Sequence, residues 1–103
     1  MRFRRRRFKD VIDRQLTFFV QDDGDLLDDV AAALERYNAA DREDAEELFG
    51  DYQLAIEAAT DRLQELRDSF ARTLDEDDAD EYAAEFNDAV VARWRELSLT
   101  IDD

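Results

Sequence analysis

The segment DREDAEELFGDYQLAIEAATDRLQELRDSFARTL, residues 41–74, decides the fold. Its apolar residues recur at intervals of three and four, the spacing of one face of an α-helix. They form a band about 120° wide, which suits a helix that faces a core along its whole length. The segment therefore predicts one long central helix, and its apolar residues are Ala45, Leu48, Phe49, Tyr52, Ala55, Ile56, Ala59, Leu63, Leu66, Phe70 and Leu74.

The composition also favours long helices. The chain of 103 residues contains no proline and two glycines, and 45% of its residues are hydrophobic. This length suffices for one domain with a modest core, and the hydrophobic content separates the chain from disordered proteins. One glycine, Gly50, falls inside the central helix, where it marks a kink or a close backbone contact, or is simply an isolated tolerated glycine.

Further helical segments flank the central one. Apolar residues at helical spacing predict helices over residues 25–38 and 75–97, and the lengths of these helices suit antiparallel packing along opposite halves of the central helix. The connection at residues 39–41 allows either a kink or a reversal. We expect an all-α fold, an antiparallel helical hairpin or bundle of about four helices with one long central helix.

The segment 8–20 predicts another helix, separated from the next by a turn at residues 22–25. Its apolar arc is roughly 200° wide, broader than one neighbouring helix covers. We therefore expect this helix to lack a full partner within the chain and to pack against a second copy or a permanent partner. The residues buried there are expected to be Phe8, Ile12, Leu16, Phe18 and Phe19.

Charge is distributed unevenly along the chain. Residues 1–9 carry six positive charges and no negative ones, whereas residues 10–103 carry eight positive and 29 negative charges. We divide the chain into a basic N-terminal arm, residues 1–7, and a single helical domain, residues 8–103. Arginine pairs with carboxylates and phosphates, and aromatic rings stack on bases. The candidate partner-binding residues are Arg2, Phe3, Arg4, Arg5, Arg6, Arg7, Phe8, Lys9, Ile12, Leu16, Phe18 and Phe19.

The residues required for common catalytic and metal sites are missing from the sequence. The chain has no cysteine and no histidine, so thiolate sites and the Glu-x-x-His pairs of di-iron bundles are excluded. A calcium loop starting at Asp75 requires glycine at the position of Asp80 and glutamate at that of Phe86. The other acidic clusters fall on helix faces away from the apolar stripes, where carboxylate pKa values are not tuned by burial. We expect no cofactor, no metal and no enzymatic activity.

The sequence favours a non-catalytic protein–protein interaction module, an accessory or adaptor subunit or a homo-oligomer, that docks through the arm and the first helix. Two alternatives remain: a nucleic-acid-associated protein tethered by the arm, and an acidic body that binds a basic partner. No apolar run approaches the roughly 20 residues of a membrane span. Charged residues directly after Lys9 interrupt any export signal, so we expect a cytoplasmic protein.

Overall fold

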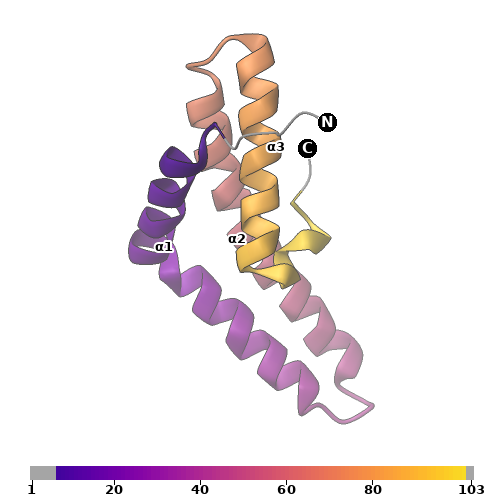
Figure 1. Cartoon of the computed structure of the whole chain (residues 1–103). Coiled ribbons are helices and arrows are strands. Elements are labelled where there is room, and N and C mark those ends of the chain that lie inside the picture. The colour runs from indigo at the N-terminus through magenta and orange to yellow at the C-terminus, as the bar shows by residue number, and fades with distance from the viewer. Residues whose placement is uncertain (1–6, 102–103) are drawn as a thin grey trace.

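The computed structural model describes residues 7–101, apart from the side chain of Leu99. Over these residues the fold is all-α, as predicted: α1 spans Lys9–Asn38, α2 Ala45–Ala71 and α3 Glu76–Arg93, followed by the short 3-10 helix η1, Arg95–Leu99 (Figure 1). The prediction of about four helices is wrong by one, because the segments predicted at 8–20 and 25–38 are continuous in α1.

A kink divides α1 into two halves. Asp23 has φ −123° and ψ 22°, which is not helical. Asp22, Asp23 and Gly24 have low helix propensity and favour turns, so the helix bends where the sequence predicted a turn. From α2, Arg62 Nε donates a hydrogen bond of 3.0 Å to Asp23 Oδ2. The kink is therefore held by an ion pair to the central helix.

A reversal, not a kink, connects α1 to α2. The chain turns through residues 39–44, and the second half of α1 lies antiparallel to the first half of α2 (Figure 1). The rings of Tyr37 and Phe49 pack at the hairpin end with centroids 5.3 Å apart. The central helix is shorter than predicted, 27 residues, because residues 42–44 form a turn in which the Asp44 N–H bonds the Asp41 carbonyl.

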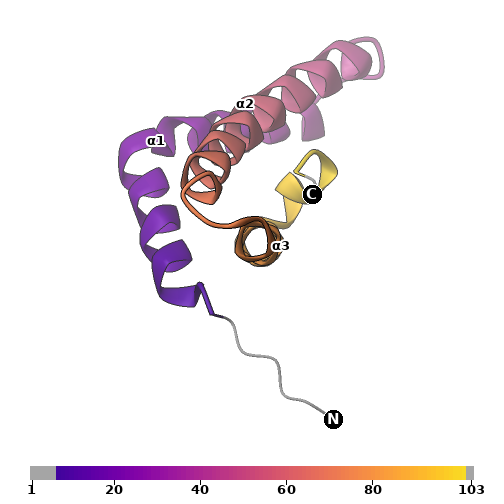
Figure 2. The same ribbon diagram turned by 90° about the horizontal axis from the view of Figure 1, so that it is seen from above.

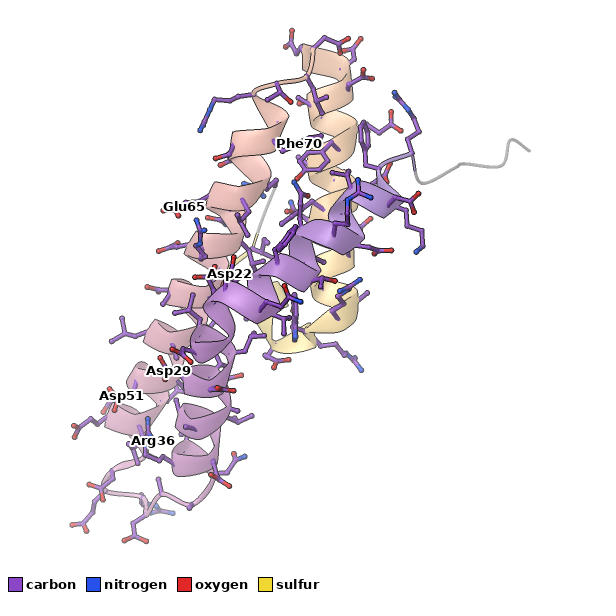
Figure 3. The ribbon with its side chains drawn as sticks, turned by 90° about the vertical axis from the view of Figure 1, so that its left-hand side faces the viewer. Asp22, Asp29, Arg36, Asp51, Glu65 and Phe70 are labelled. Atoms are coloured by element: carbon purple, nitrogen blue, oxygen red, sulfur yellow. The ribbon has the colours of Figure 1, made fainter. Side chains whose placement is uncertain are left out.

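The second half of α2 packs against α3. Asp75 caps α3, since its Oδ1 accepts a 2.9 Å hydrogen bond from the Asp78 N–H. Phe70 points from α2 toward α3, whereas Asp51 and Glu65 point away from the body (Figure 3), and the Phe70 and Tyr82 ring centroids are 4.8 Å apart. Residues 25–38 and α3 therefore lie along opposite halves of α2 (Figure 1), but only residues 76–93 of the segment predicted at 75–97 belong to α3.

After α3 the chain folds back over α2. The helix ends at Arg93 rather than at the predicted residue 97, because Trp94 adopts φ −136° and ψ 87°. Leu97 and Ile101 are then buried in the core. Thr100 Oγ1 donates a 2.8 Å hydrogen bond to Thr60 Oγ1 on α2. Seen from above, α3 stands between the first half of α1 and this C-terminal segment (Figure 2).

The first half of α1 lies inside the fold. Ile12, Leu16 and Phe19 are 2%, 0% and 1% exposed, and Phe19 packs edge-on against Trp94. The expectation that Ile12, Leu16 and Phe19 need a second molecule to bury them is wrong, because the kink lets this half of α1 cross α3 while the second half follows α2. Phe18 and Val20 of the same segment are still 59% and 46% exposed. The buried apolar core comprises Ile12, Leu16, Phe19, Val30, Ala33, Tyr52, Ile56, Ala59, Leu63, Tyr82, Phe86, Val90, Leu97 and Ile101.

Gly50 neither bends α2 nor admits a close neighbour. No non-helical residue interrupts α2, and no atom lies within 4 Å of the position that a Cβ at Gly50 occupies. Gly50 is therefore neither a kink nor a site of close backbone contact, and it is an isolated glycine that the helix tolerates.

Substitutions at two adjacent phenylalanines test the packing of α1. Phe19→Ala is expected to lower the free energy of unfolding by about 3–5 kcal/mol, since it empties a core position. Phe18→Ala is expected to change it by less than about 0.5 kcal/mol, because Phe18 is 59% exposed. Urea unfolding measures both values. Similar losses for the two variants contradict the placement of α1.

Gly50→Ala is expected to raise the free energy of unfolding by about 0.5–1 kcal/mol, because alanine restricts the unfolded chain and favours the helix. Thermal unfolding of the two proteins measures the gain. A loss of stability shows that a neighbour occupies the space beside Gly50.

Candidate interaction site

Most of the predicted arm lies outside the described residues. These positions are Arg2, Phe3, Arg4, Arg5 and Arg6. The structure describes the chain from Arg7 onward, and Arg7, Phe8 and Lys9 all contact the helical body. Of the predicted arm and the two residues after it, the structure therefore places only residues 7–9.

Arg7 is bound to the first turns of α3. Its Nη1 donates to Asp78 Oδ1 at 2.9 Å and to Glu81 Oε1 at 3.2 Å. Its guanidinium carbon lies 5.0 Å from the Phe8 ring centroid, a cation–π distance. The hydrogen bond to Asp78 is the main reason that the pKa of Arg7 is raised. The last residue of the arm, Arg7, is thus bound to α3 by arginine–carboxylate contacts.

Phe8 and Lys9 continue this attachment. The Phe8 N–H donates to Glu85 Oε1 at 3.2 Å, and the Phe8 ring meets the Tyr82 ring edge-on at 5.5 Å. Lys9 Nζ donates to Asp13 Oδ2 at 2.7 Å, one turn later in α1. Removing residues 1–9 as one unit therefore disturbs the fold as well as the arm.

The predicted apolar contact residues of α1 divide into two groups. Ile12, Leu16 and Phe19 are core residues and are not accessible to a partner in this structure, and Phe8 is half-buried. Phe18 alone in this set is largely exposed. It borders a shallow depression of about 330 Å³, which is also lined by Asp13, Arg14, Thr17 and Gln21.

A larger groove of about 820 Å³ lies between the first half of α1 and α3. Its α1 wall is formed by Lys9, Ile12 and Asp13, and its α3 wall extends from Asp80 to Arg93. Carboxylates predominate among the charged groups of the lining, and small apolar residues complete it. The carboxylates are Asp13, Asp80, Glu81, Glu85 and Asp88, and the apolar residues are Ile12, Ala84, Ala89 and Ala92.

Two of these carboxylates are neutralised by cations at the ends of the groove. Asp13 accepts from Lys9 and, at 2.9 Å, from Arg93 Nη2, and the Lys9 hydrogen bond contributes most to the lowered pKa of Asp13. Glu81 pairs with Arg7. Within residues 7–101, Asp80 and Asp88 form no ion pair.

Glu85 is the unusual member of the lining. One of its oxygens accepts from the Phe8 N–H, whereas Oε2 is buried and finds no hydrogen-bond partner among the described residues. A buried carboxylate oxygen without a partner carries a desolvation cost of about 1–3 kcal/mol or more.

Sequence reasoning missed this groove, because it placed every acidic cluster on a fully exposed helix face. Glu85 is half-buried instead. The available signal was its position in α3, between Tyr82 and Phe86 of the apolar stripe. The packing of α1 against α3, which creates the groove, has no counterpart in the sequence pattern.

Tyr82 holds the two walls together. Its hydroxyl donates a 2.7 Å hydrogen bond to Gln15 Oε1 on α1, and its ring packs against Phe8, Phe70 and Phe86. Burial of the phenol raises the pKa of Tyr82 to about 12. One buried side chain thereby joins α1, α2 and α3 beside the groove.

Within residues 7–101, no group of three or more histidine, cysteine, aspartate or glutamate residues is arranged to hold a metal ion. In the same part of the chain, no helix has both the length and the apolar character needed to cross a membrane.

Comparison with known proteins finds no matching family model, no matching curated protein and no matching solved structure.

Alkaline titration tests the role of Tyr82. The pKa is raised in the folded state from about 10 to about 12, so the neutral phenol stabilises the fold below about pH 10 and this contribution disappears as the pH rises toward 12. We expect a loss of roughly 1–3 kcal/mol across that interval. Urea unfolding at several pH values measures it.

Tyr82→Phe is expected to abolish this part of the pH dependence, whereas the control Tyr37→Phe keeps Tyr82 and so keeps the loss. An unchanged pH profile in the Tyr82 variant contradicts the assignment.

Proposed function

We propose that the protein is a non-catalytic interaction module, an accessory or adaptor subunit, that docks on a protein partner through its Arg-rich N-terminal arm and the exposed side of α1. The observation that supports this most is the attachment of Arg7. A guanidinium bound by two carboxylates at 2.9 and 3.2 Å is the contact that further arginines of the arm can make with an acidic partner surface.

The contribution of α1 is narrower than the sequence indicated. Since Ile12, Leu16 and Phe19 belong to the core, only Phe18 of the predicted set presents a largely exposed ring. An exposed aromatic beside a shallow depression suits the edge of a protein contact. The proposed docking surface therefore combines the arm with Phe18.

A second candidate function is the binding of a basic partner by the acidic body. The α1–α3 groove favours it, because three carboxylate groups of the lining lack a cationic partner among the described residues. Nucleic-acid binding through the arm is the remaining alternative. The net charge of −21 on residues 10–103 opposes it by repelling phosphates. A cytoplasmic location belongs to the same proposal.

The test is a nuclease-treated pull-down from native lysate with the full-length chain. The arm variant replaces the arginines at positions 2, 4, 5 and 6 with serine. It leaves Arg7 and Phe8 in contact with α3 and Lys9 paired with Asp13. A Phe18→Ser variant tests the exposed ring. A control replaces four exposed arginines of the body that form no ion pair among the described residues: Arg36, Arg42, Arg72 and Arg95.

We expect one protein to be retained in stoichiometric amount by the wild type and the control, and roughly tenfold less by the arm variant, since several charge-assisted contacts are lost. Calorimetry with the purified partner then measures the affinity directly. Retention of nucleic acid alone, cleared by nuclease, replaces the proposal with the tethering alternative. Equal retention by the arm variant contradicts the role of the arm.

A further inference from the structure

The unpaired carboxylates of the α1–α3 groove lie along one side of α3. Asp80, Glu85 and Asp88 fall within about two and a half helical turns, and none of Asp80, Asp88 or Glu85 Oε2 has a cationic or hydrogen-bonding partner among residues 7–101. The groove is hollow and partly apolar rather than a convex charged surface. It has the shape and charge of a site for a short cationic segment with an apolar side chain.

The contacts of α1 show in which direction the chain enters this region. Asp13 bonds Arg93, the Phe8 N–H bonds Glu85, and Arg7 bonds Glu81 and Asp78. From residue 13 back to residue 7, the contacts therefore move steadily toward the start of α3. Arg7, the first described residue, is therefore attached near the start of α3, before the part of the helix that carries Glu85 and Asp88.

We propose that the α1–α3 groove of one copy binds residues 1–6 of a second copy, so that two copies exchange their arms. This inference rests on the proposed docking function of the arm and names its partner. The contact repeats around a twofold axis, since each copy supplies one arm and one groove. No partner other than this chain is needed to provide the complementary segment.

The chemistry of the arm matches the lining of the groove. Residues 1–6 contain four arginines and Phe3. The guanidinium groups pair with the exposed carboxylates of Asp80 and Asp88, and the Phe3 ring packs on the accessible apolar lining, which includes Ala89 and Ala92. Binding neutralises charges that repel one another along α3.

Repulsion between two acidic bodies does not prevent this exchange. Six residues reach up to roughly 20 Å when extended, whereas charges are screened over about 8 Å at physiological ionic strength. An arm of this length therefore bridges two bodies of net charge −21 without bringing their acidic surfaces into contact. Attraction acts locally, between the arm and the groove.

Sedimentation velocity of the full-length chain across the micromolar range tests the proposal. The groove variant combines Glu85→Gln, which keeps the oxygen that accepts from Phe8, with Asp88→Asn on the exposed surface. A variant with Asp88→Asn alone leaves the buried position intact. The matched control is Glu47→Gln with Asp51→Asn, two exposed positions on α2 that lose the same charge. Circular dichroism and thermal unfolding establish that each variant is folded.

We expect a concentration-dependent dimer of the wild type. Its dissociation constant is expected to rise roughly ten- to a hundredfold in the groove variant and in the arm variant, and to remain unchanged in the control. Asp88→Asn alone is expected to raise it less. A monomer at every concentration overturns the proposal, as does a dimer that neither the arm nor the groove substitutions weaken.

Mixing the two variants distinguishes exchange from any other role of these residues. The arm variant retains an intact groove and the groove variant an intact arm, so the pair recovers one of the two contacts. Energy transfer between differently labelled copies is expected to report a heterodimer that neither variant forms alone. A mixture as monomeric as its components overturns the exchange.

The proposed function is tested separately by the pull-down. A monomeric chain that retains another protein through its arm ends the exchange and leaves the docking function standing. A chain that neither dimerises nor retains a protein ends both.

Discussion

The kink at Asp23 is the constraint on which the fold depends. It divides one helix into two segments with different directions, so that the first packs on α3 while the second follows α2. A straight helix of 30 residues could not cover both neighbours, and Phe19 and Leu16 would lose their enclosure. The hydrogen bond of 3.0 Å from Arg62 to Asp23 ties this bend to the central helix. Most of the broad apolar arc of residues 8–20 is thereby covered within the chain, by α2 on one side and by α3 and Trp94 on the other, whereas Phe18 and Val20 stay exposed.

Polar groups inside this packing fix how the helices meet. Tyr82 bonds Gln15 across the α1–α3 contact, and Arg67 on α2, which is 7% exposed, donates a 2.8 Å hydrogen bond to Asn87 Oδ1 on α3. Apolar side chains tolerate sliding of one helix past another better than such pairs do, since a shift leaves buried donors or acceptors unsatisfied. The same register places Glu85 and Asp88 of α3 beside Ile12 and Asp13 of α1, which produces the acidic groove.

The described part of the basic segment lies beside the acidic groove of the helical body. Arg7, the last residue of the basic arm, is attached beside the acidic groove through Asp78 and Glu81. Both proposals start from this arrangement. Residues 1–6 carry four further arginines, and the groove carries carboxylates that have no cationic partner among residues 7–101.

The sequence by itself determined the helical class, the central helix and the break near residue 39, because helical periodicity and helix propensity act over a few residues. It also located the break near Asp23, although not its outcome. Tertiary structure alone decided that Ile12, Leu16 and Phe19 enter the core and that Phe18 does not, since this depends on the direction of α1 after the kink. It alone formed the groove with the buried oxygen of Glu85, because both walls of that groove come from segments about 70 residues apart, and no local pattern encodes which carboxylates will face one another across such a distance.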